Sequence, residues 1–159
     1  MLAVSNLHTV QTISSQKLAT ALNKNWPEDR ESLLNVLIQV NTSGEDSKSG
    51  LSSSDDEIVD LARFIVKSCP RLHLQGLMTI GSLSESLSGD ENRDFELLKK
   101  ARDQLQTTLK EQEIDGWGED GKLVLSMGMS SDFEAALRAE SDIVRVGTGI
   151  FGERVKKAT

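Results

Sequence analysis

Small and hydroxyl-bearing residues follow two strand-like segments near the end of the sequence. The stretch LVLSMGMSSDFEAALRAESDIVRVGTGIFGE (residues 123–153) reads as strand, turn, helix, strand and second turn. The small residues in its turns are Ser126, Gly128, Ser130, Gly147, Thr148 and Gly149. They leave backbone N–H groups uncovered, and such groups bind anions, most often phosphate, near helix starts. Two interpretations stay open, a phosphate site or turns that only reverse the chain.

Two charged residues bear on this choice. Asp132 is itself a good N-cap anion, which disfavours a phosphate directly on the helix that it starts and shifts the predicted seat to Gly147 and Thr148. Arg145 interrupts the apolar segment DIVRV, and strand alternation places it on the face opposite Val144. A buried arginine needs a partner. An ion pair inside a barrel and a cation directed at a ligand are equally compatible with this position.

The remaining polar candidates give weaker signals. His8 and His73 have no second ligand at metal-binding spacing, so we expect structural roles for both. Trp117, in the sequence DGWGEDG, is expected to be an aromatic residue of a surface loop. Cys69 precedes Pro70 at an expected helix end, and we predict a buried structural thiol there.

Strand-like and helical segments alternate along the chain and would position these residues. Strands are predicted for residues 6–13, 35–41, 72–80, 123–127 and 142–146. The first helix has Ser14 or Ser15 as its N-cap, and Ser54 with Glu57 fits a capping box for the second. Residues 35–41 form a nearly continuous apolar run, typical of a strand buried on both faces. The alternation predicts an α/β fold with a parallel sheet and outer helices, either doubly wound or a (β/α) barrel.

Composition restricts the function classes. A chain of 159 residues fits one domain, and its net charge of −7 disfavours nucleic acid and anionic membrane surfaces as partners. The apolar runs are too short to cross a bilayer. The N-terminal residues lack the cationic region of a signal peptide, and a single cysteine suits a reducing compartment. We therefore expect a cytoplasmic protein, with a mitochondrial location as the alternative.

Four long motifs resemble one known family. They are IQVNTSGEDSKSG, LQGLMTIGS, LSMGMSSDFEAAL and VRVGTGIFGER, and they occur in the order typical of the pyridoxal phosphate homeostasis proteins, the YggS/PROSC family. The resemblance spans about residues 7–154. It implies the fold of the alanine racemase N-terminal barrel, a TIM-type (β/α)8 barrel. Residues 1–159 would then be a single domain that carries parallel strands four to eight with outer helices and lacks the first three βα units.

The same resemblance assigns roles to individual residues. Ser126, Met127, Gly147 and Thr148 match the positions that hold the phosphate of pyridoxal 5′-phosphate (PLP), and Arg145 matches the arginine facing the pyridine nitrogen. The family's Schiff-base lysine belongs to the end of the first strand, a segment that this sequence does not contain. Among the lysines that are present, Lys48 is the one expected near the mouth of the barrel.

The implied function is non-catalytic binding of PLP in intracellular PLP homeostasis. One alternative is a half-barrel interaction protein without stable PLP binding. A second is an amino-acid racemase, which needs another base, a tyrosine in alanine racemase, whereas this sequence contains no tyrosine. The expected small-molecule partner is PLP, with no nucleic acid or membrane. The open sheet edges of a partial barrel also predict self-association.

Overall fold

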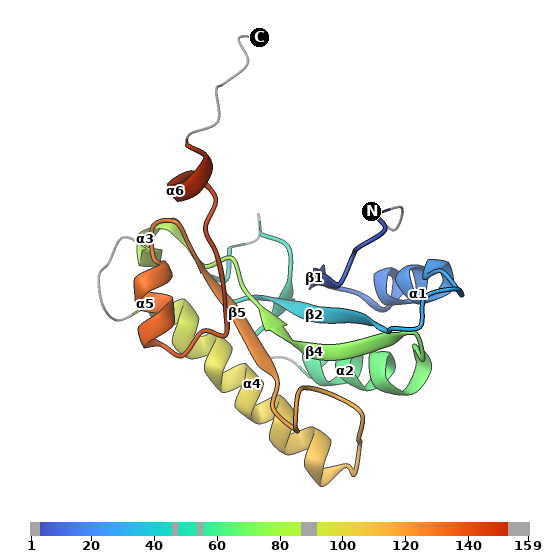
Figure 1. Ribbon diagram of the computed structural model, residues 1–159. Helices are drawn as coiled ribbons and strands as arrows, with labels where there is room; N and C mark the ends of the chain where they lie inside the picture. Colours follow the sequence, from blue (N-terminus) through green and yellow to red (C-terminus); the bar gives the residue numbers. More distant parts are fainter. Residues whose placement is uncertain (1–3, 46–47, 54–55, 87–91, 153–159) are drawn as a thin grey trace.

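The fold is a curved parallel sheet with helices on its outer face (Figure 1). The computed structural model describes residues 4–45, 48–53, 56–86 and 92–152. The strands are β1 (Thr9–Ile13), β2 (Leu34–Asn41), β3 (Leu51–Ser52), β4 (Leu72–Met78), β5 (Val124–Met129) and β6 (Ile143–Arg145). The helices are α1 (Gln16–Asn25), α2 (Glu57–Ser68), α3 (Leu83–Ser86), α4 (Arg93–Glu111), α5 (Phe133–Arg138) and α6 (Thr148–Phe151).

The order of the main strands is β1-β2-β4-β5-β6, and every pairing is parallel. Each of these strands overlaps one of the five predicted strand segments, although β5 continues past the predicted end at residue 127, so the predicted α/β alternation is confirmed. The two-residue β3, which pairs with β2, lies outside the five predicted strand segments.

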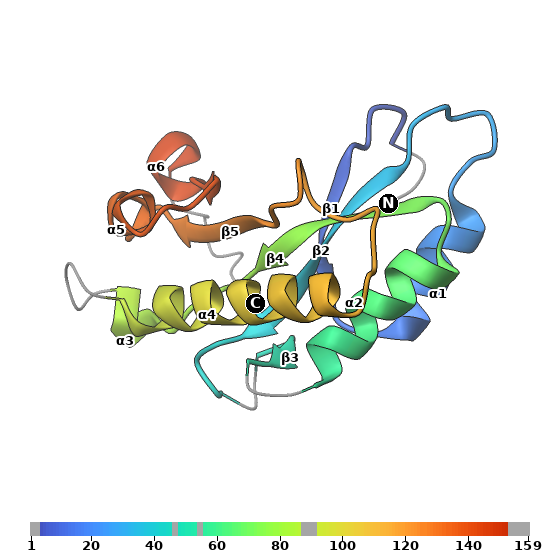
Figure 2. The same ribbon diagram turned by 90° about the horizontal axis from the view of Figure 1, so that it is seen from below.

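Helices α1, α2 and α4 cover one face of the sheet (Figure 2). Helix α1 begins after Ser15, whose Oγ accepts a hydrogen bond from the N–H of Leu18 at 3.2 Å. Ser15 is therefore the N-cap of the two serines considered. Helix α2 begins after Asp56, and Ser54 of the predicted capping box lies outside the described residues.

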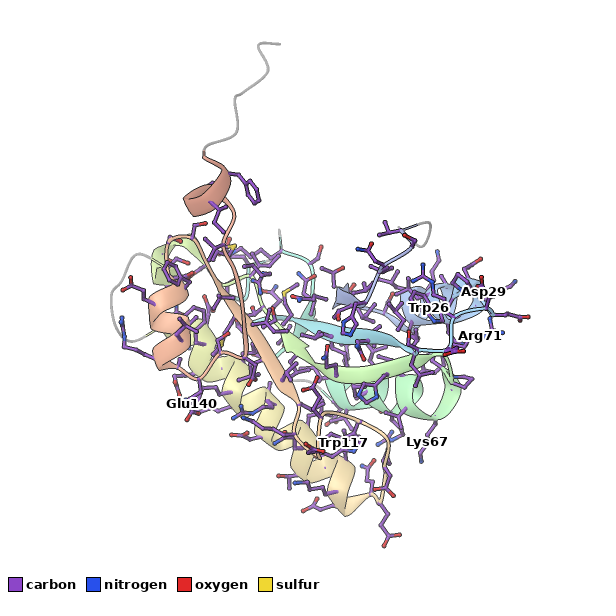
Figure 3. The ribbon with its side chains drawn as sticks, in the orientation of Figure 1. Trp26, Asp29, Lys67, Arg71, Trp117 and Glu140 are labelled. Atoms are coloured by element: carbon purple, nitrogen blue, oxygen red, sulfur yellow. The ribbon has the colours of Figure 1, made fainter. Side chains whose placement is uncertain are left out.

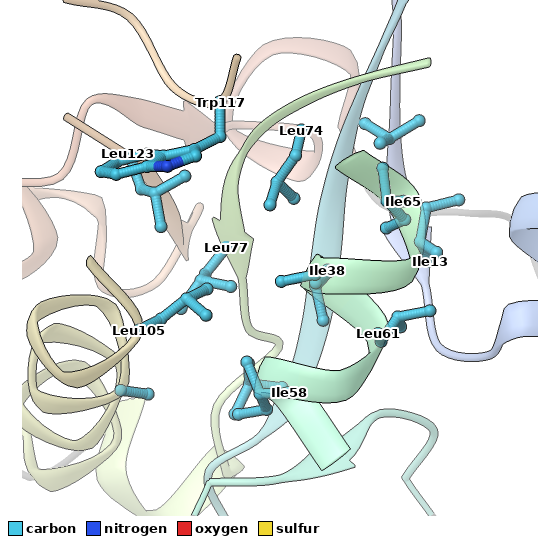
Figure 4. Packing of buried hydrophobic residues seen from close by; sticks show 14 of the residues in the cluster. Ile13, Ile38, Ile58, Leu61, Ile65, Leu74, Leu77, Leu105, Trp117 and Leu123 are labelled. Carbon is cyan, nitrogen blue, oxygen red and sulfur yellow. The ribbon is translucent and has the colours of Figure 1, made fainter. Parts of the chain in front are cut away.

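The core lies between the sheet and these helices. Five consecutive residues of β2, Val36–Val40, are buried, which confirms that this strand is covered on both faces. The apolar stripe of α2 is also buried and packs toward the sheet (Figure 4). It consists of Ile58, Leu61, Ala62 and Ile65. At the end of α2, the predicted buried thiol is confirmed, since Cys69 is 1% exposed and burial raises its pKa.

Trp117 corrects one prediction from the sequence. The residue lies in the loop between α4 and β5 (Figure 3). Its side chain is 7% exposed and belongs to the core, where it lies beside Leu123 (Figure 4). Gly116 and Gly118 on either side have positive φ angles of 84° and 67°, which let the loop turn the indole inward. The indole N–H donates to the carbonyl of Ile114 at 2.6 Å, so its polar atom is satisfied.

The sheet curls as in a barrel. Ser126 Oγ on β5 donates a hydrogen bond of 2.7 Å to Gln11 Oε1 on β1, although β2 and β4 separate these strands in the sheet. A flat sheet with strands about 4.8 Å apart would keep the two side chains out of reach. The curvature decides between the two predicted architectures in favour of the partial (β/α) barrel.

Candidate functional site

A pocket opens where β5 and β6 end and the chain turns into α5 and α6. Its volume is about 880 Å³. The residues that line it are Met129, Ser130, Ser131, Arg145, Gly147, Thr148, Phe151 and Gly152. In a (β/α) barrel the loops after the last two strands often build a phosphate site, and this pocket occupies the corresponding place.

Two backbone amides converge on one oxygen in this pocket. The N–H groups of Gly147 and Gly149 donate to Ser130 Oγ at 3.0 and 3.2 Å. An anion oxygen at or beside this hydroxyl would meet the same two donors, as in other anion-binding nests. A Cβ atom added at Gly147 would meet nothing within 4 Å, so the space next to this amide is open. In the structure, the Ser130 hydroxyl is the oxygen that accepts from both amides.

Arg145 lies against the same pocket and is held at two points. Its Nη1 donates to Ser126 Oγ and its Nη2 to the carbonyl of Thr79, both at 2.7 Å. Burial lowers the pKa of the guanidinium, and the carboxylate of Asp132 partly opposes that shift. The ion pairs found within the described residues do not include Arg145. Its position in the pocket wall favours the ligand-directed interpretation over a barrel ion pair.

Ser126 and Met127 are fully buried, and neither side chain lines the pocket. The amide of Met127 donates to Ser141 Oγ at 3.3 Å, away from Gly147. The strand continues to Met129, so the exposed part of the turn starts later than the small residues suggested. The structure brings Arg145, Gly147 and Thr148 to the pocket, and the phosphate role of Ser126 and Met127 stays a prediction.

Gly128 makes this turn possible. Its φ of +91° is unfavourable for other residues, and a Cβ there would fall on the Cβ of Ala136 in α5. Glycine thus lets α5 pack directly against the end of β5.

Asp132 differs from its predicted role as a capping anion. Its carboxylate makes no hydrogen bond to the first amides of α5. Instead, Oδ1 accepts from the amide of Met129 at 2.6 Å, and Oδ2 accepts from Ser86 Oγ at 2.5 Å. The carboxylate therefore closes the turn after β5 and does not cap α5.

Lys48 lies at a neighbouring cavity of about 280 Å³ that Thr79 also lines. Its ammonium donates to the carbonyl of Gly81 and to Glu45 Oε1, both at 2.8 Å. Thr79 thus connects the surroundings of Lys48 with those of Arg145, since its carbonyl accepts from the guanidinium. The predicted position of Lys48 near the ends of the strands agrees with this arrangement.

The two histidines each make a hydrogen-bond contact within the fold. His73 Nε2 lies 3.1 Å from the carbonyl of Gly118, and His8 Nδ1 lies 2.8 Å from Thr9 Oγ1. The residues that the structure describes contain no group of three or more potential ligands around a metal position. Their helices also include none that is long and apolar enough to cross a membrane.

Two contributors to this region were not predicted from the sequence. Gln11 contacts Ser126, and Thr79 contacts Arg145. The available signal was a polar side chain within or directly after an apolar strand segment. That signal becomes specific only when the strand order places the residues together.

A model of the alanine racemase N-terminal domain matches residues 1–155. The chain belongs to this family. It is also similar to the pyridoxal phosphate homeostasis protein of Homo sapiens, with 42% identity over 155 residues that cover 97% of this chain and 53% of that protein. The chain spans about half the length of the curated relatives it matches.

Solved structures support the same fold. A protein of Bifidobacterium adolescentis described as unknown has 35% identity and a TM-score of 0.70, with 90% of this chain and 52% of that chain covered. PipY of Synechococcus elongatus, solved with PLP bound, has 22% identity and a TM-score of 0.67, with 94% and 63% covered. The predicted partial barrel of the alanine racemase type is confirmed by these matches.

Proposed function

We propose that this chain binds pyridoxal 5′-phosphate within a protein of PLP homeostasis. The observation that carries the proposal is the convergence of the Gly147 and Gly149 amides on Ser130 Oγ, beside Arg145 in one pocket. Amide donors and a hydroxyl suit a phosphate, and a guanidinium suits a heteroaromatic nitrogen acceptor. The similarity to pyridoxal phosphate homeostasis proteins supports the same ligand.

Different residues would bind the phosphate and the ring of the cofactor. Ser130, Gly147, Thr148 and Gly149 hold the phosphate, with Ser126 and Met127 supporting their turn from below. Arg145 faces the ring nitrogen. The bound group supplies an electron-withdrawing ring, whose power depends on protonation of that nitrogen. A guanidinium can only donate a hydrogen bond, so it keeps the nitrogen unprotonated.

A ring with an unprotonated nitrogen withdraws electrons less strongly. For this reason we propose binding and delivery of the cofactor without catalysis, rather than racemisation. We place this role in the cytoplasm. The buried, unpaired thiol of Cys69 suits the reducing conditions there.

Gly147→Val tests the phosphate seat. The φ of −108° at this position is accessible to valine, and open space surrounds the new Cβ, so the fold is expected to persist. The branched side chain enters the pocket and shields the amide. We expect PLP binding to weaken at least about tenfold by isothermal titration calorimetry, the scale of a lost hydrogen bond to a charged group.

Gly147→Ala is the matched control, since it adds the Cβ alone and should have a smaller effect. Circular dichroism melts of both variants verify the fold. Equal PLP affinity in Gly147→Val and the parent chain would contradict the proposed seat.

An interaction role through the sheet edges is the second candidate. Among the described strands, β1 pairs only with β2, and β6 only with β5. Unpaired edges recruit other strands. We expect the 159-residue chain to sediment as larger species as its concentration rises. Thr12→Lys, which places a charge on the exposed side of β1, should reduce this association.

Thr20→Lys is the control for the added charge, because Thr20 is exposed and lies on helix α1 rather than on a strand. Sedimentation of the parent chain as a monomer over the whole concentration range would rule out edge-mediated association.

A further inference from the structure

A chain of hydrogen bonds links Arg145 to the first strand. Arg145 Nη1 donates to Ser126 Oγ, and Ser126 Oγ donates to Gln11 Oε1, each at 2.7 Å. These three residues come from β6, β5 and β1. The guanidinium in the pocket wall is thus connected to a strand on the opposite side of the curved sheet.

The direction of these hydrogen bonds is fixed by chemistry. Arginine has no acceptor, so the Ser126 oxygen must accept from the guanidinium. The hydroxyl has a single proton, and the contact with Gln11 Oε1 gives that proton an acceptor. Ser126 is fully buried, where a hydroxyl proton without an acceptor is destabilising. Gln11 therefore keeps the Ser126 lone pair turned toward Arg145.

The backbone directs Gln11 to this position. Val10 lies opposite Val36 and Ile13 opposite Ile38, so Gln11 and Thr12 share the single partner Leu37. This is a β-bulge, a feature that reorients side chains next to binding sites. A second register shift lies between Ser126 and Met129 on β5. The irregularities on both strands thus flank the contact between Gln11 and Ser126.

We propose that Gln11 is a positioning residue for the ligand-facing guanidinium of Arg145. It acts through the Ser126 hydroxyl, while the carbonyl of Thr79 fixes the second Nη atom. The inference deepens the proposed function and rests on it in one respect, that Arg145 faces the ring of the ligand. It predicts that Gln11 affects recognition of the ring end and not of the phosphate end.

The test compares Gln11→Leu with Gln11→Glu. Leucine removes the acceptor, so PLP should bind about tenfold more weakly, the scale of one charge-linked hydrogen bond. Glutamate keeps an acceptor at the same reach and should restore most of the affinity. Inorganic phosphate, measured by calorimetry as a second ligand, should bind equally to all three chains, because it uses Ser130 and Gly147. Gln16→Leu, at an exposed position of α1, is the control for the substitution.

A double-mutant cycle with Arg145→Met separates positioning from direct contact. Without the guanidinium, Gln11→Leu should cause no further loss of PLP affinity. Additive losses, equal PLP affinities of Gln11→Leu and the parent, or a parallel loss of phosphate binding would each overturn the inference.

The chemical reactivity of Arg145, measured without ligand, tests the positioning role of Gln11 even if PLP does not bind. Phenylglyoxal modification of Arg145, mapped by mass spectrometry and normalised to Arg63 on α2, should be several-fold faster in Gln11→Leu than in the parent. An unchanged rate overturns the positioning role. Absence of PLP binding by the parent chain, by contrast, overturns the proposed function and leaves the rate comparison valid.

Discussion

Trp117→Ala is expected to lower the free energy of unfolding by about 3–5 kcal/mol, the usual cost of truncating a large buried aromatic residue. The side chain is 7% exposed, and its N–H is bonded to Ile114. The same loop is joined to β4 by the amide of Gly118, which donates to Leu74 at 2.7 Å. Loss of the indole therefore opens a cavity and loosens a connection between the loop and the sheet. Urea unfolding followed by circular dichroism measures the change.

Phe151→Ala is the matched control, because Phe151 is 86% exposed. A surface truncation of this kind usually changes stability by less than about 0.5 kcal/mol. Equal unfolding midpoints for the two variants would place the indole in solvent, as the polar sequence around it first suggested.

Trp117 illustrates why the fold was more predictable than its details. The strands and helices follow from local periodicity. Residues such as Ile58 and Leu61, for example, recur at the spacing that places apolar side chains on one face of a helix. Burial of the indole depends on the turns at Gly116 and Gly118 and on distant residues of β4. Charged and glycine neighbours are typical of exposed loops, so the local composition predicted an exposed indole.

The site, like the fold, could be predicted in outline but not in detail. The small residues of the final two turns indicated an anion site, and Gly147 and Thr148 do line the pocket. The end of β5 was placed too early, because periodicity does not determine where a strand stops pairing. Gln11 could not be found from the sequence at all, since its contact with Ser126 spans the chain and requires the curvature of the sheet.

Arg145 was predicted from the sequence as a site residue, but its hydrogen-bond partners become known only from the fold. Its guanidinium spans Ser126 Oγ on β5 and the carbonyl of Thr79, the residue directly after β4, so these two contacts fix its orientation. Desolvation of the charge by burial lowers its pKa, yet an arginine stays protonated at neutral pH. The residue therefore presents a constant, oriented cation to the pocket.

Arg145→Met is expected to weaken PLP binding by about tenfold to about 100-fold, the range for losing a hydrogen bond that involves a charge. Methionine preserves much of the apolar length but leaves the ring nitrogen without a donor. Arg145→Lys should fail to restore the affinity, because one ammonium on a flexible stem does not reproduce the planar fork between Ser126 and Thr79. Calorimetric titration with PLP and with inorganic phosphate gives both affinities.

The two ligands distinguish a ring contact from general damage to the pocket. If Arg145 faces the ring, both variants lose PLP affinity and retain phosphate affinity, with melting curves that verify folding. A loss of phosphate binding as large as the loss of PLP binding would instead assign the guanidinium to the phosphate. Full PLP affinity in Arg145→Met would remove Arg145 from the site, and the oriented cation would then serve only to join β6 to β5 and β4.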